Sequence, residues 1–294
     1  MSVCVACPRA CGVDRKVNIG FCGAGEDALI ARVGLHRWEE PCISGSDAAR
    51  GSGTVFFGGC NLRCVFCQNY ELSHSAKGKK YSPDELEAAM LSLVESGAYN
   101  INLVTATHFV PYILPVLRSV KPKIGVPIVY NCGGYESVET LKMLEGIVDV
   151  YLPDFKYFSS EISAKYSRAG DYFTVACATL FEMHRQVGAV RFDEDGMIRK
   201  GMIVRHLVLP SCRKESIEVL HALAKLLPVE DIKLSLMRQY TPDFALGCEY
   251  SELHRRLTEF EYSSVLKVAD ELGFDGYFQG KDSADKKFTP DFEG

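Results

Sequence analysis

The residues with the most specific chemistry in this sequence are three closely spaced cysteines. They follow the pattern C-x3-C-x2-C and comprise Cys60, Cys64 and Cys67. Iron–sulfur clusters are ligated by cysteine thiolates, and a cubane cluster contains four irons. Three local ligands therefore leave one iron without a protein thiolate. In zinc proteins an open coordination position distinguishes catalytic sites from structural ones, so by analogy the spacing predicts a catalytic 4Fe–4S cluster.

Two other interpretations of these cysteines are less favoured. Three close cysteines also occur in structural zinc sites completed by a distant residue, or as inert buried thiols. Zinc sites usually pair their cysteines as two C-x2-C units. Here the cysteines instead follow Gly58-Gly59 and the apolar run 54–57. The two glycines let the backbone turn sharply as it leaves a strand, which favours an iron–sulfur loop at a strand end.

A second group of cysteines precedes the first and comprises Cys4, Cys7, Cys11 and Cys22. Four cysteines suit either a closed tetrahedral zinc site or an additional iron–sulfur cluster. Spacing alone does not separate these two metals, and thiols that are merely buried are a third interpretation. Cys42 is an alternative to Cys22 as a ligand of this group. The glycines and charged residues between Cys11 and Gly25 predict loops rather than regular structure.

Composition limits the class of protein. The chain has 294 residues, 47% of them hydrophobic and 24% charged, which is ordinary for a globular protein with a sizeable core. A net charge of −5 without a long basic run predicts no nucleic-acid partner. No apolar run is long enough to cross a membrane, and the start does not resemble a signal peptide. We therefore expect a cytoplasmic protein with no membrane partner.

Cysteine usage supports metal binding in a reducing compartment. Eight of the twelve cysteines lie at or before Cys67. A disulfide scaffold fits poorly with a long chain that has no secretion signal. Between the two cysteine groups lies the segment 36–45, which contains the adjacent Glu39 and Glu40. We expect this segment to lie near the loop that carries Cys60, Cys64 and Cys67 (the cluster loop), because the chain tethers it there. We expect its two glutamates to occupy a solvated turn.

From residue 53 onward strands and helices alternate, which predicts βα units around a parallel sheet. Ser82, Pro83 and Glu85 mark a helix start with a capping box. The predicted strands are 53–57, 100–104, 126–130, 147–152, 202–209 and 231–236, with a hairpin at 191–200 and a terminal strand at 273–277. The predicted helices are 82–96, 110–119, 136–145, 159–187 (broken near Gly170), 214–226 and 262–272.

This order predicts an α/β fold, a partial (β/α)6 TIM-like barrel with a cysteine-rich N-terminal extension. Right-handed crossovers favour that closing geometry. The expected organisation is a cysteine-rich segment at 1–50, the barrel at 51–280 and a C-terminal tail at 281–294. In such barrels the active site lies at the carboxyl ends of the strands.

The triad and its surroundings resemble the radical S-adenosylmethionine (SAM) superfamily, in which an aromatic residue, here Phe66, precedes the last cysteine. The fuller stretch 53–69 resembles homologues of pyruvate formate-lyase activating enzyme. The resemblance implies a 4Fe–4S cluster that cleaves SAM reductively to a 5′-deoxyadenosyl radical, which then abstracts a hydrogen from the substrate. It favours a glycine of a partner protein, a glycyl-radical enzyme, as substrate. Another peptide or a small molecule is the alternative, because the extra cysteines precede the triad instead of following it.

The resemblance also implies roles for residues at the strand ends. The run Asp154-Phe155-Lys156 resembles a motif that binds the ribose and carboxylate of SAM, and Arg205 matches an arginine that reaches the SAM carboxylate. The other residues expected at the cofactor are Phe66, Thr105, His108 and Asn131. Weaker candidates for substrate contact are Arg238, Gln239 and Tyr240.

The expected partner is an electron donor such as flavodoxin or ferredoxin. A non-catalytic iron–sulfur electron carrier is the competing class, and a zinc-dependent binding module is a third.

Overall fold

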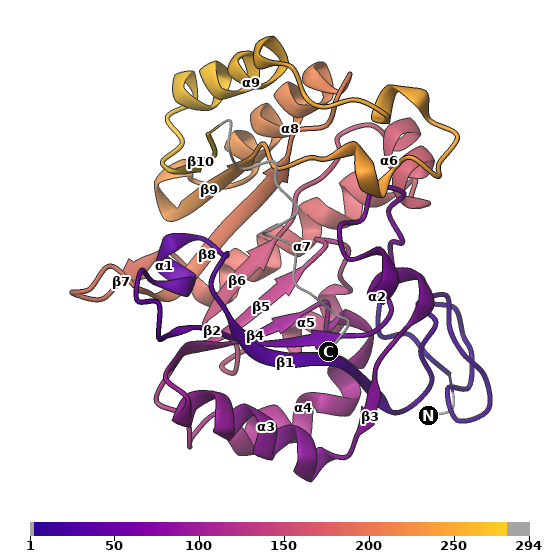
Figure 1. The fold of residues 1–294 in the computed structure, drawn as a ribbon, viewed down its shortest axis with the longest axis vertical. Coiled ribbons are helices and arrows are strands. Elements are labelled where there is room, and N and C mark those ends of the chain that lie inside the picture. The colour runs from indigo at the N-terminus through magenta and orange to yellow at the C-terminus, as the bar shows by residue number, and fades with distance from the viewer. Residues whose placement is uncertain (1–2, 281–294) are drawn as a thin grey trace.

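The computed structural model describes residues 3–280, in which one curved sheet is covered by helices on its outer face (Figure 1). Its parallel strands are β2 (Gly51–Phe57), β4 (Ala98–Val104), β5 (Ile128–Cys132), β6 (Val150–Pro153), β8 (Ile198–Leu207), β9 (Ile232–Met237) and β10 (Gly276–Phe278). The strand order is β10-β9-β8-β6-β5-β4-β2-β1-β3. The sheet does not close, so the predicted partial TIM-like barrel is confirmed.

One edge of the sheet is antiparallel and was not predicted. β1 (Ala28–His36) pairs antiparallel with β2, and β3 (Lys79–Tyr81) pairs antiparallel with β1. Most of β1 is only half-buried, so it has no clear alternation of apolar and polar residues. Periodicity therefore did not reveal this strand. The hairpin predicted at 191–200 is present, with β7 (Arg191–Phe192) paired to the start of β8.

The helices mostly match the predicted ranges. Ser82 and Glu85 form the predicted capping box at the start of α3. The helix predicted at 136–145 is much shorter, because only 138–142 is helical and a turn follows. The helices are α1 (Pro41–Ser44), α2 (Tyr70–Ser75), α3 (Pro83–Glu95), α4 (Val110–Val120), α5 (Val138–Lys142), α6 (Ser160–Ser167), α7 (Tyr172–Val187), α8 (Arg213–Leu226) and α9 (Glu259–Glu271).

The two faces of the sheet pack against different partners. Alternate residues of a strand point to opposite faces: Tyr130 of β5 belongs to the large core beneath the helices, whereas Val129 belongs to a small inner cluster. Ile43 of α1 is fully buried in that inner cluster with Val150 and other strand residues. Helix α1 therefore fills the concave side of the unclosed barrel.

The N-terminal segment is attached to the barrel beside the cysteine loop. The backbone N–H of Cys60 donates to the carbonyl of Cys22 at 3.3 Å. Arg9 donates from Nε to the carbonyl of Asn61 at 2.8 Å, and the Thr140 hydroxyl donates to the carbonyl of Ala6 at 3.0 Å. These contacts hold both cysteine groups in one part of the molecule.

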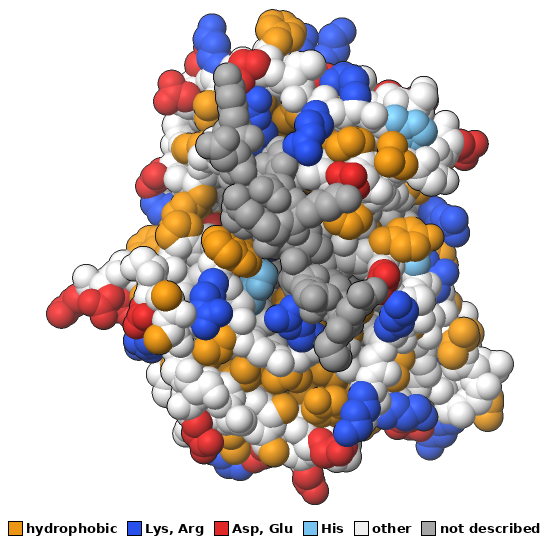
Figure 2. Space-filling model, in the orientation of Figure 1, with side chains coloured by type: hydrophobic (Ala, Val, Ile, Leu, Met, Phe, Trp, Pro, Cys, Tyr) orange, Lys and Arg blue, Asp and Glu red, His pale blue; other side chains and the backbone are white. Residues whose placement is uncertain are grey.

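Surface charge, helix length and the C-terminal tail bear on the remaining expectations from the sequence. Positively and negatively charged side chains are mixed over the face shown in Figure 2. None of the helices between residues 3 and 280 is long and apolar enough to span a membrane. The predicted C-terminal tail, 281–294, lies outside the described residues.

Helix α1 should contribute strongly to stability through Ile43. We expect Ile43→Ala to lower the free energy of unfolding by about 2–5 kcal/mol, because it leaves a cavity in a fully buried cluster. Leu246→Ala is the control, since this leucine is 59% exposed and should change stability by less than about 0.5 kcal/mol. Urea unfolding measures both. Equal effects would contradict the packing of α1 inside the barrel.

Gly59 should be irreplaceable for a separate reason. Its φ is +85°, and an added Cβ would stand 2.4 Å from the carbonyl oxygen of Cys22. Gly146 has a similar φ of +77° but open space around it. We expect Gly146→Ala to cost about 1–2 kcal/mol and Gly59→Ala about 3 kcal/mol or more, because the clash adds to the backbone strain. Urea unfolding of the two variants compares them, and similar losses would refute the contact with Cys22.

Candidate active site

The three cysteines of the triad lie on the loop that follows β2 and line one cavity of about 360 Å³. Gly58 and Gly59 begin this loop, and their N–H groups donate to the carbonyls of Leu29 and Leu72, each at 2.8 Å. A Cβ on Gly58 would stand 2.2 Å from the carbonyl oxygen of Lys77. The chain therefore needs glycine here to bring the cysteines to the end of the strand.

The sulfur atoms have hydrogen-bond donors suited to thiolates. The N–H of Leu62 points to Cys60 Sγ at 3.4 Å, and the hydroxyl of Ser167 points to Cys64 Sγ at 2.8 Å. Burial and the neighbouring Cys64 together raise the pKa of the Cys67 thiol to about 12. Because cysteine ligands must be deprotonated, binding of a cluster would require these thiols to lose their protons. Three cysteines on one cavity wall, two of them with such donors, fit a 4Fe–4S cluster.

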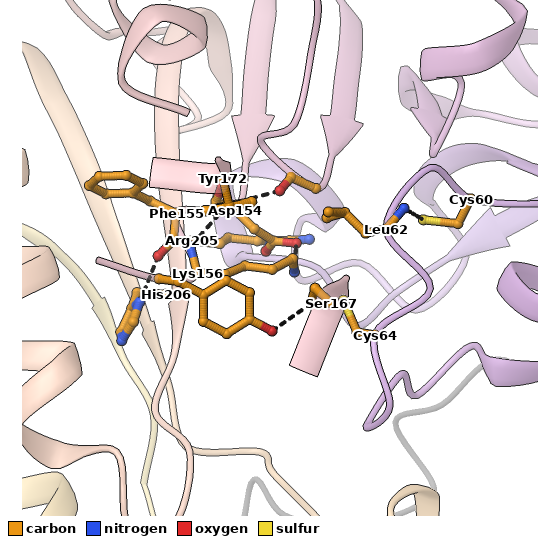
Figure 3. A network of polar contacts seen from close by, with 12 residues as sticks. Cys60, Leu62, Cys64, Asp154, Phe155, Lys156, Ser167, Tyr172, Arg205 and His206 are labelled. Atoms are coloured by element: carbon orange, nitrogen blue, oxygen red, sulfur yellow. Dashed lines mark hydrogen bonds and ion pairs between the residues drawn. The ribbon is translucent and has the colours of Figure 1, made fainter. Parts of the chain in front are cut away.

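Asp154 and Lys156 lie at the end of β6, close to the cysteines (Figure 3). They form an ion pair with each other, and the N–H of Lys156 donates to the hydroxyl of Tyr172 at 3.0 Å. Burial acts to lower the pKa of Lys156, but the negative charge of the Asp154 carboxylate holds this pKa well above its ordinary value. An ammonium group therefore stays charged beside the cluster loop.

Arg205 enters the cavity from β8, but its guanidinium already has partners. It donates from Nε to Glu40 Oε1 at 2.8 Å and from Nη2 to both Glu40 and Glu39. The side chains of the two glutamates are only 5% and 9% exposed. The expectation that they occupy a solvated turn is therefore wrong, because the turn before α1 directs them into the barrel. In this structure Arg205 binds these two carboxylates.

The remaining predicted cofactor residues fall into two groups. Phe66, Thr105 and Asn131 line the cavity. His108 does not: its Nε2 lies 2.9 Å from the carbonyl of Gly58. Burial lowers the pKa of His108 to about 4, so it supports the cysteine loop from behind as a neutral ring.

The weaker substrate candidates also divide. Gln239 lines the cavity, whereas Arg238 and Tyr240 do not. Arg238 pairs with Glu259, and the Tyr240 hydroxyl donates to the carbonyl of Leu253.

The four N-terminal cysteines are free and lie near one another. Cys11 Sγ and Cys22 Sγ stand 3.2 and 3.5 Å from the point where a Gly20 Cβ would be. Cys42 lies apart, in the inner cluster of α1, against which Tyr277 packs. Among the described residues, no three Cys, His, Asp or Glu side chains converge tightly enough for a single metal ion, and this includes both cysteine groups.

Glu39 and Glu40 are two charged cavity residues that the sequence did not predict. The segment 36–45 held a weak signal, since it carries two adjacent carboxylates and the only tryptophan of the chain, and Trp38 also lines the cavity. Their cationic partner, Arg205, lies 166 positions after Glu39 and 165 after Glu40. Sequence spacing cannot reveal such a pair.

The chain is similar to known proteins in sequence and in fold. Residues 54–185 match the radical SAM superfamily. The chain is 30% identical over 283 residues to uncharacterized protein MJ0674 of Methanocaldococcus jannaschii, covering 92% of this chain and 75% of that protein.

Solved structures share the fold at low sequence identity. HydG, a maturase of the FeFe hydrogenase, matches with a TM-score of 0.52 and 15% identity, covering 82% of this chain and 54% of HydG. A mutant of spore photoproduct lyase matches with a TM-score of 0.51 and 12% identity, covering 80% of this chain and 77% of that protein. This chain thus spans about half the length of HydG. The family match shows that residues 54–185 form a radical SAM superfamily domain.

Proposed function

We propose that this protein is a radical SAM enzyme in which Cys60, Cys64 and Cys67 hold a 4Fe–4S cluster and the adjoining cavity holds SAM. One observation carries the proposal: the three cysteines line the same cavity as Asp154 and Lys156. A non-catalytic electron carrier needs the cysteines but has no use for that cavity or for a charged pair within it. A zinc-binding module has no use for them either.

The residues of the chain would bind and orient the cofactor. When bound, the cluster would supply one electron that cleaves SAM to methionine and a 5′-deoxyadenosyl radical. The ammonium of Lys156 suits the SAM carboxylate, and the carboxylate of Asp154 suits the ribose hydroxyls. Because Glu39 and Glu40 engage Arg205, Lys156 is the cation that we assign to the SAM carboxylate. Phe66, Thr105 and Asn131 would complete the wall around SAM.

The substrate and the electron donor are narrower proposals. The sequence resemblance favours hydrogen abstraction from a glycine of a partner protein, with another peptide or a small molecule as the alternative. We expect a flavodoxin or a ferredoxin to supply the electron.

Cleavage of SAM tests the proposed chemistry. The anaerobically reconstituted protein, reduced with dithionite, should form 5′-deoxyadenosine from SAM, as measured by liquid chromatography. Cys64→Ala should lower this rate by at least about 100-fold, because loss of a ligand exceeds the usual cost of losing a supporting residue. Cys177→Ala, a half-buried cysteine of α7 outside the cavity, is the control. No product from protein with an intact cluster would refute the enzyme.

We also propose that Cys4, Cys7, Cys11 and Cys22 ligate a second 4Fe–4S cluster. A zinc ion needs its sulfurs about 2.3 Å from one point, whereas a cubane spreads its ligands over separate irons. The N-terminal cysteines do not converge at single-ion distances, and neither does the triad. Gly20 leaves space between two of the sulfurs.

The charges around this group also favour an anionic centre. Arg15 approaches Cys22. Burial raises the pKa of the Cys22 thiol, and the guanidinium of Arg15 acts to lower it. Within residues 3–280, the Nε and Nη2 atoms of Arg15 are buried and have no hydrogen-bond partner, so they are available to the sulfurs of a thiolate-ligated cluster. The contact between Cys22 and Cys60 would bring such a cluster next to the first one, as an entry point for electrons.

Iron content separates the two groups. The reconstituted protein should hold about eight irons per chain. Replacing the three triad cysteines with alanine, or the four N-terminal cysteines with serine, should each leave about four. Cys177→Ser should change nothing. Iron and zinc are measured together by mass spectrometry after anaerobic purification. Zinc in the variant that lacks the triad, or about four irons in the unaltered protein, would exclude the second cluster.

A further inference from the structure

The segments that carry the two cysteine groups differ in charge from the rest of the chain. Residues 3–24 contain three basic side chains and one acidic side chain, and the cluster loop adds Arg63 and no acid. The whole chain, in contrast, has a net charge of −5. Figure 1 shows the N-terminal loops at one side of the barrel, next to α2. Positive charge is therefore concentrated in the part of the molecule that holds both cysteine groups.

Two arginines of this region lie against one aromatic ring. The guanidinium of Arg9 lies 4.1 Å from the centre of the Phe21 ring, and that of Arg63 lies 5.2 Å from it. Arg9 donates to the carbonyls of Asn61, at 2.8 Å, and of Ser167, at 3.2 Å, which are neutral partners. Within residues 3–280, neither guanidinium is paired with a carboxylate. Two uncompensated positive charges therefore lie beside the cluster loop.

Arg168 extends the same positive region. Its carbonyl accepts a hydrogen bond from Arg9, so the two residues are adjacent. Burial lowers the pKa of His74 on α2, and the charges of Arg63 and Arg168 lower it further. Arg168 is exposed, and its side chain has no hydrogen-bond or ion-pair partner in the described part of the chain. Arg9, Arg63 and Arg168 thus form one cationic patch that the protein itself does not neutralise.

The N-terminal loops also expose aliphatic side chains. Val5, Val17 and Ile19 are between 62% and 77% exposed, and all three lie among the four N-terminal cysteines in the sequence. Single exposed aliphatic residues are ordinary, whereas a group of them beside polar residues marks a site of protein interaction. Arginine is also enriched at interfaces between proteins. The loops therefore have the composition of a docking surface.

The position of the arginines indicates what kind of partner would bind there. Arg63 lies within the triad motif, and Arg9 lies between Cys7 and Cys11 in the chain. A partner bound to these arginines would contact the loops of both cysteine groups. Each cleavage of SAM consumes one electron, which has to come from outside the chain. A redox protein on this surface would bring its electron close to the cysteines.

We propose that this surface binds an acidic electron-carrier protein. We call it the docking face and define it as Val5, Val17, Ile19, Arg9, Arg63 and Arg168. The acidic partner follows from charge complementarity, which steers association, and electron-transfer complexes need only a small interface. In the transfer, the carrier is oxidised by one electron and the adjoining cluster is reduced by one, and no bond forms or breaks. The proposal rests on the radical SAM function for its demand for electrons.

Binding tests the docking face directly. A flavodoxin and a ferredoxin, each acidic around its redox centre, are titrated calorimetrically into the reconstituted protein. At least one should bind, and raising the salt concentration from about 50 mM to about 300 mM should weaken it by at least about fivefold, because salt screens surface charge. Arg168→Glu should weaken binding by about tenfold, because it sets like charges against each other. Arg118→Glu, at an exposed arginine of α4, should change it by less than about twofold.

A second pair of variants tests the aliphatic part of the docking face. Val17→Asp should weaken the carrier by about fivefold or more, because it desolvates a carboxylate in the interface. Leu246→Asp, at an exposed leucine outside the docking face, is the control. Equal binding by all variants, or no binding of either carrier, would overturn the proposal. It is also overturned if Val17→Asp converts a dimer of this chain into a monomer in sedimentation, because the face then binds a second copy.

Cleavage of SAM separates docking from chemistry. Dithionite is a small reductant that needs no docking face, so with dithionite Arg168→Glu should form 5′-deoxyadenosine at the rate of the unaltered protein. With a limiting amount of reduced carrier, its rate should fall in proportion to the loss of binding, and an unchanged rate would overturn the docking face. A protein that binds the carrier through Arg168 but forms no 5′-deoxyadenosine with dithionite would refute the proposed function and not the docking face.

Discussion

The buried ion cluster of Arg205 with Glu39 and Glu40 is the interaction on which the site depends. It joins strand β8 to a segment near the start of the chain, and directly after that segment α1 enters the concave side of the sheet. Removing one member of a buried ion pair leaves an uncompensated charge, which is far more costly than losing a surface pair. The cluster therefore fixes the position of α1 and the shape of the cavity together.

A second constraint links the N-terminal cysteines to the cluster loop. Gly59 lies against the carbonyl of Cys22, and no larger residue fits between them. The neutral ring of His108 contacts the same loop through the carbonyl of Gly58. The loop is thus held from two sides, and movement of the N-terminal segment would displace the triad. The position of the triad therefore depends on the N-terminal segment.

Local patterns predicted the features that local physics determines. The triad spacing, the capping box of Ser82 and Glu85, and the alternation of strands and helices each depend on residues close together in sequence. β1 was missed because its half-buried residues follow no clear period. The burial of Glu39 was missed because adjacent carboxylates usually lie in water, and only a guanidinium from a distant strand reverses that preference. His108 was placed at the cofactor because it follows a strand, yet its ring contacts the loop behind the cavity.

The charges of the cavity follow from this unpredicted pairing. Without Glu39 and Glu40, the charged residues of the cavity wall would be two cations, Lys156 and Arg205, and one carboxylate, Asp154. With the two glutamates, the wall carries three carboxylates and two cations. Because both glutamates bind Arg205, Lys156 is the cation left beside the cluster loop. Lys156 then suits the carboxylate of SAM, while the excess negative charge lies on the wall made by the segment before α1. The unclosed barrel admits this segment, so the same opening that leaves the sheet incomplete also determines which charge a ligand meets there.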